Sequence, residues 1–139
     1  MMVEMKTVYD FFVSGTPKAQ PRLRMTKTGH VYTPNNAKEW KETVRIACMA
    51  YRKPVITQPV KLTVWFYFSA PKRAKGYFPY PHVSKPDGDN LLKAVQDAMT
   101  EANAWIDDAI VFSSCVEKWY LFGRSGARIK VEVVEAKEY

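Results

Sequence analysis

Two pairs of acidic residues, Asp87 with Asp89 and Asp107 with Asp108, bracket a helical pattern in an otherwise basic chain. Residues 85–108 hold six acidic side chains and two lysines, a net charge of −4, whereas the other residues have 19 Lys and Arg against 8 Asp and Glu, a net charge of +11. Carboxylates that lie close together repel, and one of them takes up a proton unless a cation lies among them. Mg²⁺ prefers a few carboxylates together with waters and phosphate oxygens. The stretch therefore predicts an acidic centre that holds a metal ion against a polyanion.

The residues between the two acidic pairs predict a helix. Apolar residues recur there at spacings of 4, 3, 1 and 3, which places Leu91, Val95, Ala98, Met99 and Ala102 on one face. We expect Asp87 and Asp89 on an extended segment with their side chains on the same side, and Asp89 at the helix N-terminus, where the dipole favours its charge. Lys93 follows one turn later and can face the same site. Trp105 and Ile106 are expected to anchor the chain in the core before the second pair.

Alternation of apolar residues predicts four strands, and helical periodicity predicts two helices. The strands cover residues 3–15, 60–68, 110–121 and 128–134, and the helices cover residues 36–51 and 89–102. The order β-α-β-α-β-β favours an α/β (α+β) fold, with a single mixed sheet of about four strands and two helices. Residues 1–139 are most simply one domain, long enough to bury a substantial core.

Several finer features of these elements are expected. The first strand places Val3, Met5, Tyr9, Phe11 and Val13 on one face, and the strand over residues 60–68 is covered on both faces. Asn36 with Glu39 three residues later predicts a capping box at the start of the first helix. If the strand beginning at Ile110 lies beside strand 60–68, which feeds the loop before Asp87, the two acidic pairs meet at one end of the sheet.

The motif Lys85-Pro86-Asp87-Gly88-Asp89-Asn90, followed by Lys93, Asp97 and Trp105-Ile106-Asp107-Asp108, resembles the signature of the RusA family of Holliday-junction resolvases, which are common in phages and prophages. The resemblance implies that Asp87, Asp89 and Asp108 are essential metal-binding carboxylates, with Asp107 as a further candidate ligand. It implies that Lys93 is the essential basic residue. It also implies a homodimer that acts on four-way junction DNA.

The expected chemistry is hydrolysis of a phosphodiester with Mg²⁺, or with Mn²⁺ as an alternative ion. Mg²⁺ held by Asp87, Asp89 and Asp108 would coordinate a phosphodiester oxygen, help to generate hydroxide and neutralise the leaving 3′ oxygen. Lys93 either stabilises the pentacovalent phosphate or orients the water, and both roles stay open. A four-way junction has near two-fold symmetry, so a C₂ homodimer with one centre in each subunit would make paired cuts.

Two irregular stretches, residues 16–36 and 71–88, supply the basic residues expected to contact DNA. The basic residues of the first stretch suit phosphate contacts, although an ordinary solvated loop is the alternative. The second stretch is an 18-residue loop, and loops this long are uncommon in compact domains unless they are functional or disordered. The expected DNA-binding residues are Lys18, Arg22, Arg24, Lys27, Lys72, Arg73, Lys75 and Lys85. The second stretch also carries Tyr77, Phe78 and Tyr80, which could stack on exposed bases or simply pack on the core. Residues 15–24 resemble the basic loop of the RusA family, although Gln20 stands where another basic residue is expected.

Composition limits the remaining possibilities. A net charge of +7 and a pI near 9.4 favour an acidic partner, usually nucleic acid. There is no signal-peptide pattern and no apolar run long enough to span a bilayer, which predicts a cytoplasmic protein without membrane contact. Walker A, dinucleotide-binding and Gly-x-Ser-x-Gly motifs are missing from the sequence, so no nucleotide cofactor is expected. Cys48 and Cys115 have no metal-type spacing and are expected to be buried thiols.

Ordinary structural roles compete with the metal site. Asp89 could be an N-cap, Asp87 a turn residue, and Asp107 with Asp108 a solvated turn before a strand. His82, close to the acidic stretch, is expected to have a structural or substrate-contacting role and not to bind the metal. Two other functions stay open: a metal-dependent nuclease for flaps, nicks or single strands, and a non-catalytic DNA-binding accessory protein of recombination. An EF-hand is excluded, because Leu92 would stand where that loop requires Gly.

Overall fold

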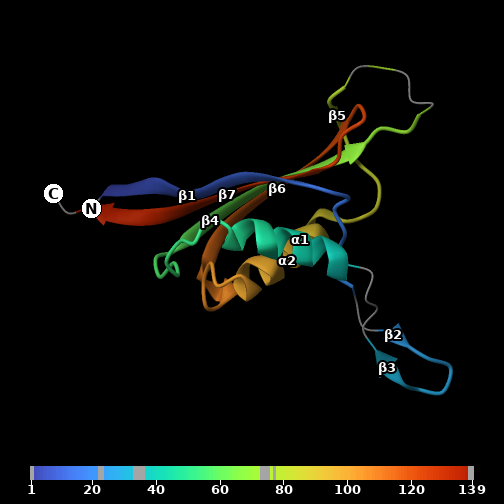
Figure 1. The fold of residues 1–139 in the computed structure, drawn as a ribbon, viewed down its shortest axis with the longest axis horizontal. Coiled ribbons are helices and arrows are strands. Elements are labelled where there is room, and N and C mark those ends of the chain that lie inside the picture. Colours follow the sequence, from blue (N-terminus) through green and yellow to red (C-terminus); the bar gives the residue numbers. More distant parts are fainter. Residues whose placement is uncertain (1, 22–23, 33–36, 73–75, 77, 138–139) are drawn as a thin grey trace.

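A five-stranded mixed sheet lies at the centre of the structure, with both helices against one of its faces (Figure 1). This computed structural model describes residues 2–21, 24–32, 37–72, 76 and 78–137. The elements in chain order are β1 (Met2–Ser14), β2 (Arg24–Met25), β3 (Val31–Tyr32), α1 (Lys38–Met49), β4 (Val60–Ser69), β5 (Tyr80–Pro81), α2 (Gly88–Glu101), the 3₁₀ turn η1 (Asp108–Ile110), β6 (Val111–Leu121) and β7 (Gly126–Lys137).

The order of the strands in the sheet is β1-β7-β4-β6-β5. β7 pairs antiparallel with both β1 and β4, whereas β4 and β6 run parallel. The predicted mixed sheet with two helices is therefore confirmed, and its four long strands are the predicted ones. Two short additions went unpredicted: β5, which joins the edge of β6, and the separate β2–β3 pair. Strands of two residues contain no alternation that a sequence pattern could detect.

The core lies between the sheet and the two helices. Its largest buried side chains come from the sheet, from both helices and from the segment after α2, and they include Val44, Leu62, Phe66, Leu91, Met99, Trp105 and Ile129. The apolar stripe predicted for α2 is buried, because its Leu91, Val95, Ala98 and Met99 face this core. Within the described residues, no helix covers the other face of the sheet (Figure 1), where Trp65 and Tyr67 of β4 are only half-buried. The expectation that this strand is covered on both faces is therefore wrong.

A β-bulge changes the face on which the start of β1 points. The pairing of β1 with β7 shifts register between Thr7 and Tyr9, so one extra residue enters β1 there. An extra residue moves the preceding side chains to the opposite face. Tyr9 is buried as predicted, but Met5 is 37% exposed and Val3 is 61% exposed. The predicted common face for all these residues is wrong at its N-terminal end.

Two further expectations need correction. α1 begins at Lys38 with Ala37 at its N-cap position, not with the predicted cap Asn36, which lies outside the described residues. Cys48 is buried in α1, but Cys115 is exposed. Over Val111–Lys118, β6 has β4 on one side and, among the described strands, none on the other, so Cys115 lies near an open edge. None of the helices within the described ranges is long and apolar enough to span a membrane.

Candidate active site

The first acidic pair lies at the start of α2. Asp87 precedes the helix with an extended backbone (φ −70°, ψ 144°), and Asp89 belongs to the first turn, where the helix dipole favours its charge. The two residues do not share one extended segment as predicted, because the helix already begins at Gly88. A side chain at Gly88 would meet Val116 of β6, with 3.3 Å between its Cβ and Val116 Cγ1. Glycine therefore lets the start of α2 pack closely on the sheet.

Neither carboxylate of this pair is used to cap the helix. Asp87 occupies the N-cap position, but within the described residues its side chain makes no capping hydrogen bond. Its Oδ2 instead accepts a hydrogen bond from Lys85 Nζ at 3.1 Å. Asp89 Oδ1 accepts from the backbone N–H of the next residue, Asn90, at 2.9 Å. The proposal that Asp89 is merely an N-cap is not supported by this geometry.

Lys118 of β6 holds the segment that leads into Asp87. Its Nζ donates to the carbonyl oxygens of Ser84 at 2.9 Å and Pro86 at 2.8 Å. The Lys118 carbonyl accepts from the backbone N–H of His82 at 2.9 Å. Lys118 was not predicted from the sequence, although a signal existed, because it stands among the mostly apolar even-numbered residues of its strand. A partly buried cation there needs acceptors, and the backbone carbonyls before Asp87 provide them.

The segment after β1 reaches the same end of α2. The backbone N–H of Gln20 donates to the carbonyl of Asn90 at 2.9 Å. Gln20 stands where a basic residue was expected, and its main chain joins the segment after β1 to the start of α2. Lys18 is exposed on this segment and lines a hollow of about 250 Å³ between the end of β1 and α1.

The second acidic pair follows a buried anchor. Trp105 is fully buried, and its Nε1 donates to Thr100 Oγ1 of α2 at 2.8 Å. Ile106 is 77% exposed, so the predicted anchor consists of Trp105 alone. Asp107 Oδ1 accepts from the backbone N–H of Ala109 at 2.8 Å and so begins the η1 turn that contains Asp108.

A hollow of about 400 Å³ brings Lys93 together with the second acidic pair. Its lining residues are Lys93, Asp97, Thr100, Glu101, Ile106, Asp107 and Asp108. Lys93 Nζ lies 3.6 Å from Asp97 Oδ1, and Lys41 Nζ of α1 lies 3.6 Å from Asp97 Oδ2. Asp89 is one turn before Lys93 on the same side of α2. Lys93 therefore stands between the two acidic pairs along the helix.

The two acidic pairs are placed relative to the sheet in a different way from the one expected. β4 and β6 are neighbours as the topology required, but they run parallel, with Val60 opposite Val111 and Ser69 opposite Leu121. The end of β4 that feeds the loop before Asp87 is thus at the opposite end of the sheet from Asp108. The two pairs are instead related through α2, because Asp87 and Asp89 lie at its start and Asp107 and Asp108 share a hollow with its Lys93.

The donor set suits a hard divalent cation, since Mg²⁺ prefers carboxylate oxygens. Asp87, Asp89, Asp107 and Asp108 all supply such oxygens, so they fit Mg²⁺ in chemistry. In the arrangement of the described residues, no group of three His, Cys, Asp or Glu side chains is close enough to hold a metal. A metal site from these residues therefore requires their side chains to turn toward one another.

The residues predicted to bind DNA lie on segments at one end of the molecule. The β2–β3 pair, with Lys27 in its turn, and the long connection after β4 both lie at the end away from the chain termini (Figure 1). Lys27, Lys72 and Lys85 are exposed. The backbone of Arg24 belongs to β2, whereas Arg22, Arg73 and Lys75 lie outside the described residues, as does Tyr77.

Two rings of the long connection, those of His82 and Phe78, pack against neighbouring aromatic rings. His82 is buried, and its ring stacks on Phe68 with centroids 4.3 Å apart and lies 4.6 Å from the ring of Tyr120. Burial, together with the charge of Lys118, lowers the pKa of His82 below its usual value. Phe78 packs against Phe122 with ring centroids 5.6 Å apart, whereas Tyr80 is 60% exposed.

Carboxylates before, on and after α2, with Lys93 among them on a basic α+β protein, fit the class of enzymes that hydrolyse nucleic-acid phosphodiesters. Residues 14–134 match the family model of the endodeoxyribonuclease RusA. The chain belongs to this family, which implies endodeoxyribonuclease activity. It is also similar to YqaN of Bacillus subtilis (strain 168), itself an uncharacterised protein, with 32% identity over 124 residues that cover 79% of this chain and 86% of YqaN.

Proposed function

We propose that the protein is a Mg²⁺-dependent endonuclease that resolves four-way DNA junctions by paired cuts, in DNA recombination and repair. The observation that carries this proposal is the hollow that unites Lys93 with Asp108, one helical turn from Asp89, in a chain of the RusA family. Polyanion binding agrees with the net charge of +7.

The chain's own residues would divide the chemistry between them. Bound Mg²⁺ would polarise a phosphodiester oxygen and lower the pKa of a bound water. Asp87, Asp89 and Asp108 are the proposed ligands, with Asp107 holding the η1 turn through its bond to Ala109. The Lys93 ammonium would stabilise negative charge on the phosphate, and its contact with Asp97 keeps it in the hollow.

Releasing the present contacts of the first acidic pair costs little energy. Asp87 must exchange its contact with Lys85, whose side chain is 85% exposed. Exposed ion pairs contribute at most about 1 kcal/mol, so the exchange is inexpensive when a divalent cation arrives. Asp89 needs only to release a local hydrogen bond to the backbone of the next residue.

A C₂ homodimer is part of the proposal. A four-way junction has near two-fold symmetry, and two centres related by the same symmetry would cut opposite strands. Lys18, Lys27, Lys72 and Lys85 are the proposed phosphate contacts among the described residues, joined by Arg22, Arg24, Arg73 and Lys75 of the same two segments. Sedimentation of a stable monomer, both free and on DNA, would contradict the dimer.

The function is tested by incubating the protein with an end-labelled synthetic four-way junction, a matched duplex and a flap, each with Mg²⁺, Mn²⁺ or EDTA. Symmetric nicks confined to the junction, absent in EDTA, are the expected result. Similar cutting of all three shapes would indicate a less selective nuclease. Tight binding without cutting under either metal would indicate a DNA-binding accessory protein.

A further inference from the structure

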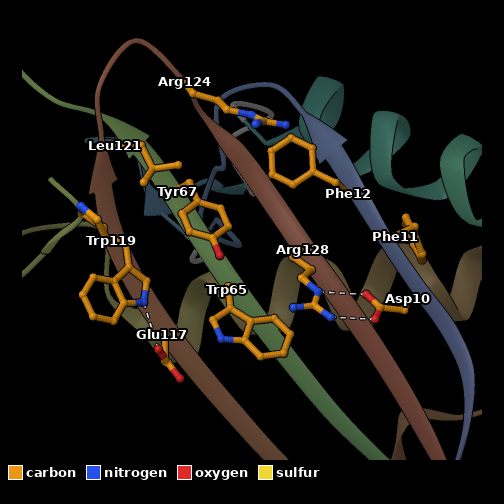
Figure 2. A pocket seen from close by; sticks show the side chains of 11 residues that line it. Asp10, Phe11, Phe12, Trp65, Tyr67, Glu117, Trp119, Leu121, Arg124 and Arg128 are labelled. Atoms are coloured by element: carbon orange, nitrogen blue, oxygen red, sulfur yellow. Dashed lines mark hydrogen bonds and ion pairs between the residues drawn. The ribbon is translucent and has the colours of Figure 1, made fainter.

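The sheet face opposite the helices carries a hollow of about 670 Å³ (Figure 2). This volume lies within the range of about 300–1,000 Å³ typical of ligand pockets. Aromatic rings and guanidinium groups line most of it, contributed chiefly by Phe12, Trp65, Tyr67, Trp119, Arg124 and Arg128. The hollow lies away from α2 and from the candidate active site, and the proposed chemistry does not use it.

The aromatic side chains come together because of strand register. In the parallel pairing of β4 with β6, Tyr67 lies opposite Trp119 and Trp65 lies opposite Glu117. Neighbouring strands therefore present adjacent rings on the same face. Figure 2 shows the Tyr67 ring between those of Trp119 and Phe12, with Arg124 beside Phe12. The ring centroids of Phe12 and Tyr67 are 6.2 Å apart. Half-buried rings on a face without a helix provide flat apolar surfaces to which a planar ligand can bind.

The carboxylates at this hollow already have partners. Asp10 accepts two hydrogen bonds from Arg128, at 2.9 and 2.7 Å, and Glu117 accepts one from Trp119 Nε1 at 2.9 Å. Arg124 lies over the Phe12 ring, 4.7 Å from its centroid, and takes part in none of the ion pairs among the described residues. The hollow thus offers aromatic surfaces, polar groups fixed in place and one guanidinium available to an anion.

The hollow adjoins the basic connection after β4. Pro79 of that connection lines it, and the neighbouring Phe78 packs on Phe122 in the β6–β7 turn that also carries Arg124. A DNA strand in contact with Lys72 or Lys85 would therefore lie on the same connection that reaches the rim of the hollow. Stacking on aromatic rings combined with basic groups along the backbone is how proteins bind unpaired bases.

We propose that this hollow binds an unpaired nucleobase of a DNA strand, stacked on the Tyr67 and Trp119 rings, with an adjacent phosphate at Arg124. The identity of the DNA rests on the proposed function, since the crossover of a four-way junction, where base pairs are disturbed, is where such an enzyme would meet a base that can leave its stack. The site itself requires only single-stranded DNA.

The test uses a single-stranded oligodeoxynucleotide of about ten thymidines with one central 2-aminopurine, titrated with the protein in EDTA. Stacking of the fluorescent base on an aromatic side chain quenches its emission. Wild-type protein is expected to quench it, and Trp119→Ala is expected to bind about 10-fold more weakly, within the roughly 5- to 150-fold range for loss of one base stack. Arg124→Gln, a change in an exposed turn, should weaken binding without a risk to folding.

Phe112→Ala is the matched control, because Phe112 is an aromatic residue of the same strand, 59% exposed and outside the hollow. It should bind the oligonucleotide as wild type does. Wild-type affinity and quenching in both Trp119→Ala and Arg124→Gln would overturn the proposal. So would conversion of a dimer into a monomer by Trp119→Ala with oligonucleotide binding unchanged, since the face would then be a subunit interface.

Failure of this proposal and failure of the proposed function give different results. Binding is measured without Mg²⁺, so it does not depend on cutting. A protein that quenches the probe but cuts no junction keeps the nucleobase site and loses the resolvase proposal. A protein that cuts junctions, with both Trp119→Ala and Arg124→Gln binding and quenching the probe like wild type, loses only the nucleobase site.

Discussion

Lys118 Nζ lies 2.8 Å from the carbonyl oxygen of Pro86, the residue immediately before Asp87. This contact joins the middle of β6 to the start of the acidic motif. Lys118 Nζ also donates to the carbonyl of Ser84, which holds the same segment at a second point. The position of Asp87 therefore depends on a residue that follows it by a full helix and a turn.

Replacing Lys118 by Met should slow cutting more than it weakens DNA binding. The change removes the donor of two carbonyl groups, one exposed and one partly buried, so the unfolding free energy should fall by only about 1 kcal/mol. It also frees the segment before Asp87, so we expect a loss in single-turnover cutting rate of about 10-fold, since misplacement of a catalytic group by about 1 Å can cost on the order of 100-fold. Lys61→Met on the neighbouring strand β4 is the control. Cutting at the wild-type rate by Lys118→Met would contradict a positioning role.

Replacing Asp97 by Asn should affect catalysis through Lys93. Asp97 is in contact with both Lys93 and Lys41, and these partly exposed ion pairs contribute no more than about 1 kcal/mol to stability. We expect a cutting rate lowered by a factor of about 3–10, with junction affinity unchanged, and partial recovery in Asp97→Glu. In a Lys93→Met background, Asp97→Asn should lower the cutting rate no further, because the contact between Lys93 and Asp97 is already absent. Additive losses in the double variant would show that Asp97 acts independently of Lys93.

His82 should make stability dependent on pH on the acid side of neutrality. Its burial between Phe68 and Tyr120, near the charge of Lys118, lowers its pKa in the folded protein. The unfolded chain then binds a proton more readily than the folded one, so stability is full above the ordinary pKa of about 6.5 and falls as pH decreases below it. The slope cannot exceed about 1.4 kcal/mol per pH unit for one proton.

The matched variant for this prediction is His82→Phe, which keeps an aromatic ring in the stack. Urea unfolding at pH 7.5, 6.5 and 5.5 should show a decrease for wild type that is absent in the variant. The pKa values of Asp10 and Glu42 are also lowered, by hydrogen bonds from Arg128 and Arg45. Their ordinary values are already near 4, so their contribution to stability is lost only below the pH range of this experiment. An equal decrease in both proteins over this range would contradict the role of His82.

The features that could be predicted are those with a repeated local signal. α2 was predicted because its apolar residues recur at helical spacing over about three turns, and the long strands because they alternate. Trp105 was predicted as an anchor and is fully buried, whereas its neighbour Ile106 is exposed. One large apolar residue identifies a core contact, but the chain direction at the following turn decides where the next side chain points.

The features that could not be predicted depend on partners far away in the sequence. The bulge in β1 appears only when its register with β7 is known, and it turns Met5 away from the core. The open face at Trp65 and Tyr67 follows from both helices packing on the other side of the sheet, which alternation does not reveal. The two carbonyls bound by Lys118 belong to a segment that precedes it by more than thirty residues.

The central claim is that Asp89 and Asp108 belong to one catalytic centre, and its most direct test separates cutting from binding. Single-turnover cutting of a four-way junction in Mg²⁺ and junction affinity in EDTA would be measured for wild type, Asp89→Asn, Asp108→Asn and the control Glu42→Gln. Loss of several kcal/mol of transition-state stabilisation predicts cutting reduced by about 1,000-fold or more in both Asp variants. Affinity should stay within about 3-fold of wild type, because it rests on Lys and Arg. Wild-type cutting by either Asp variant would contradict the proposed centre.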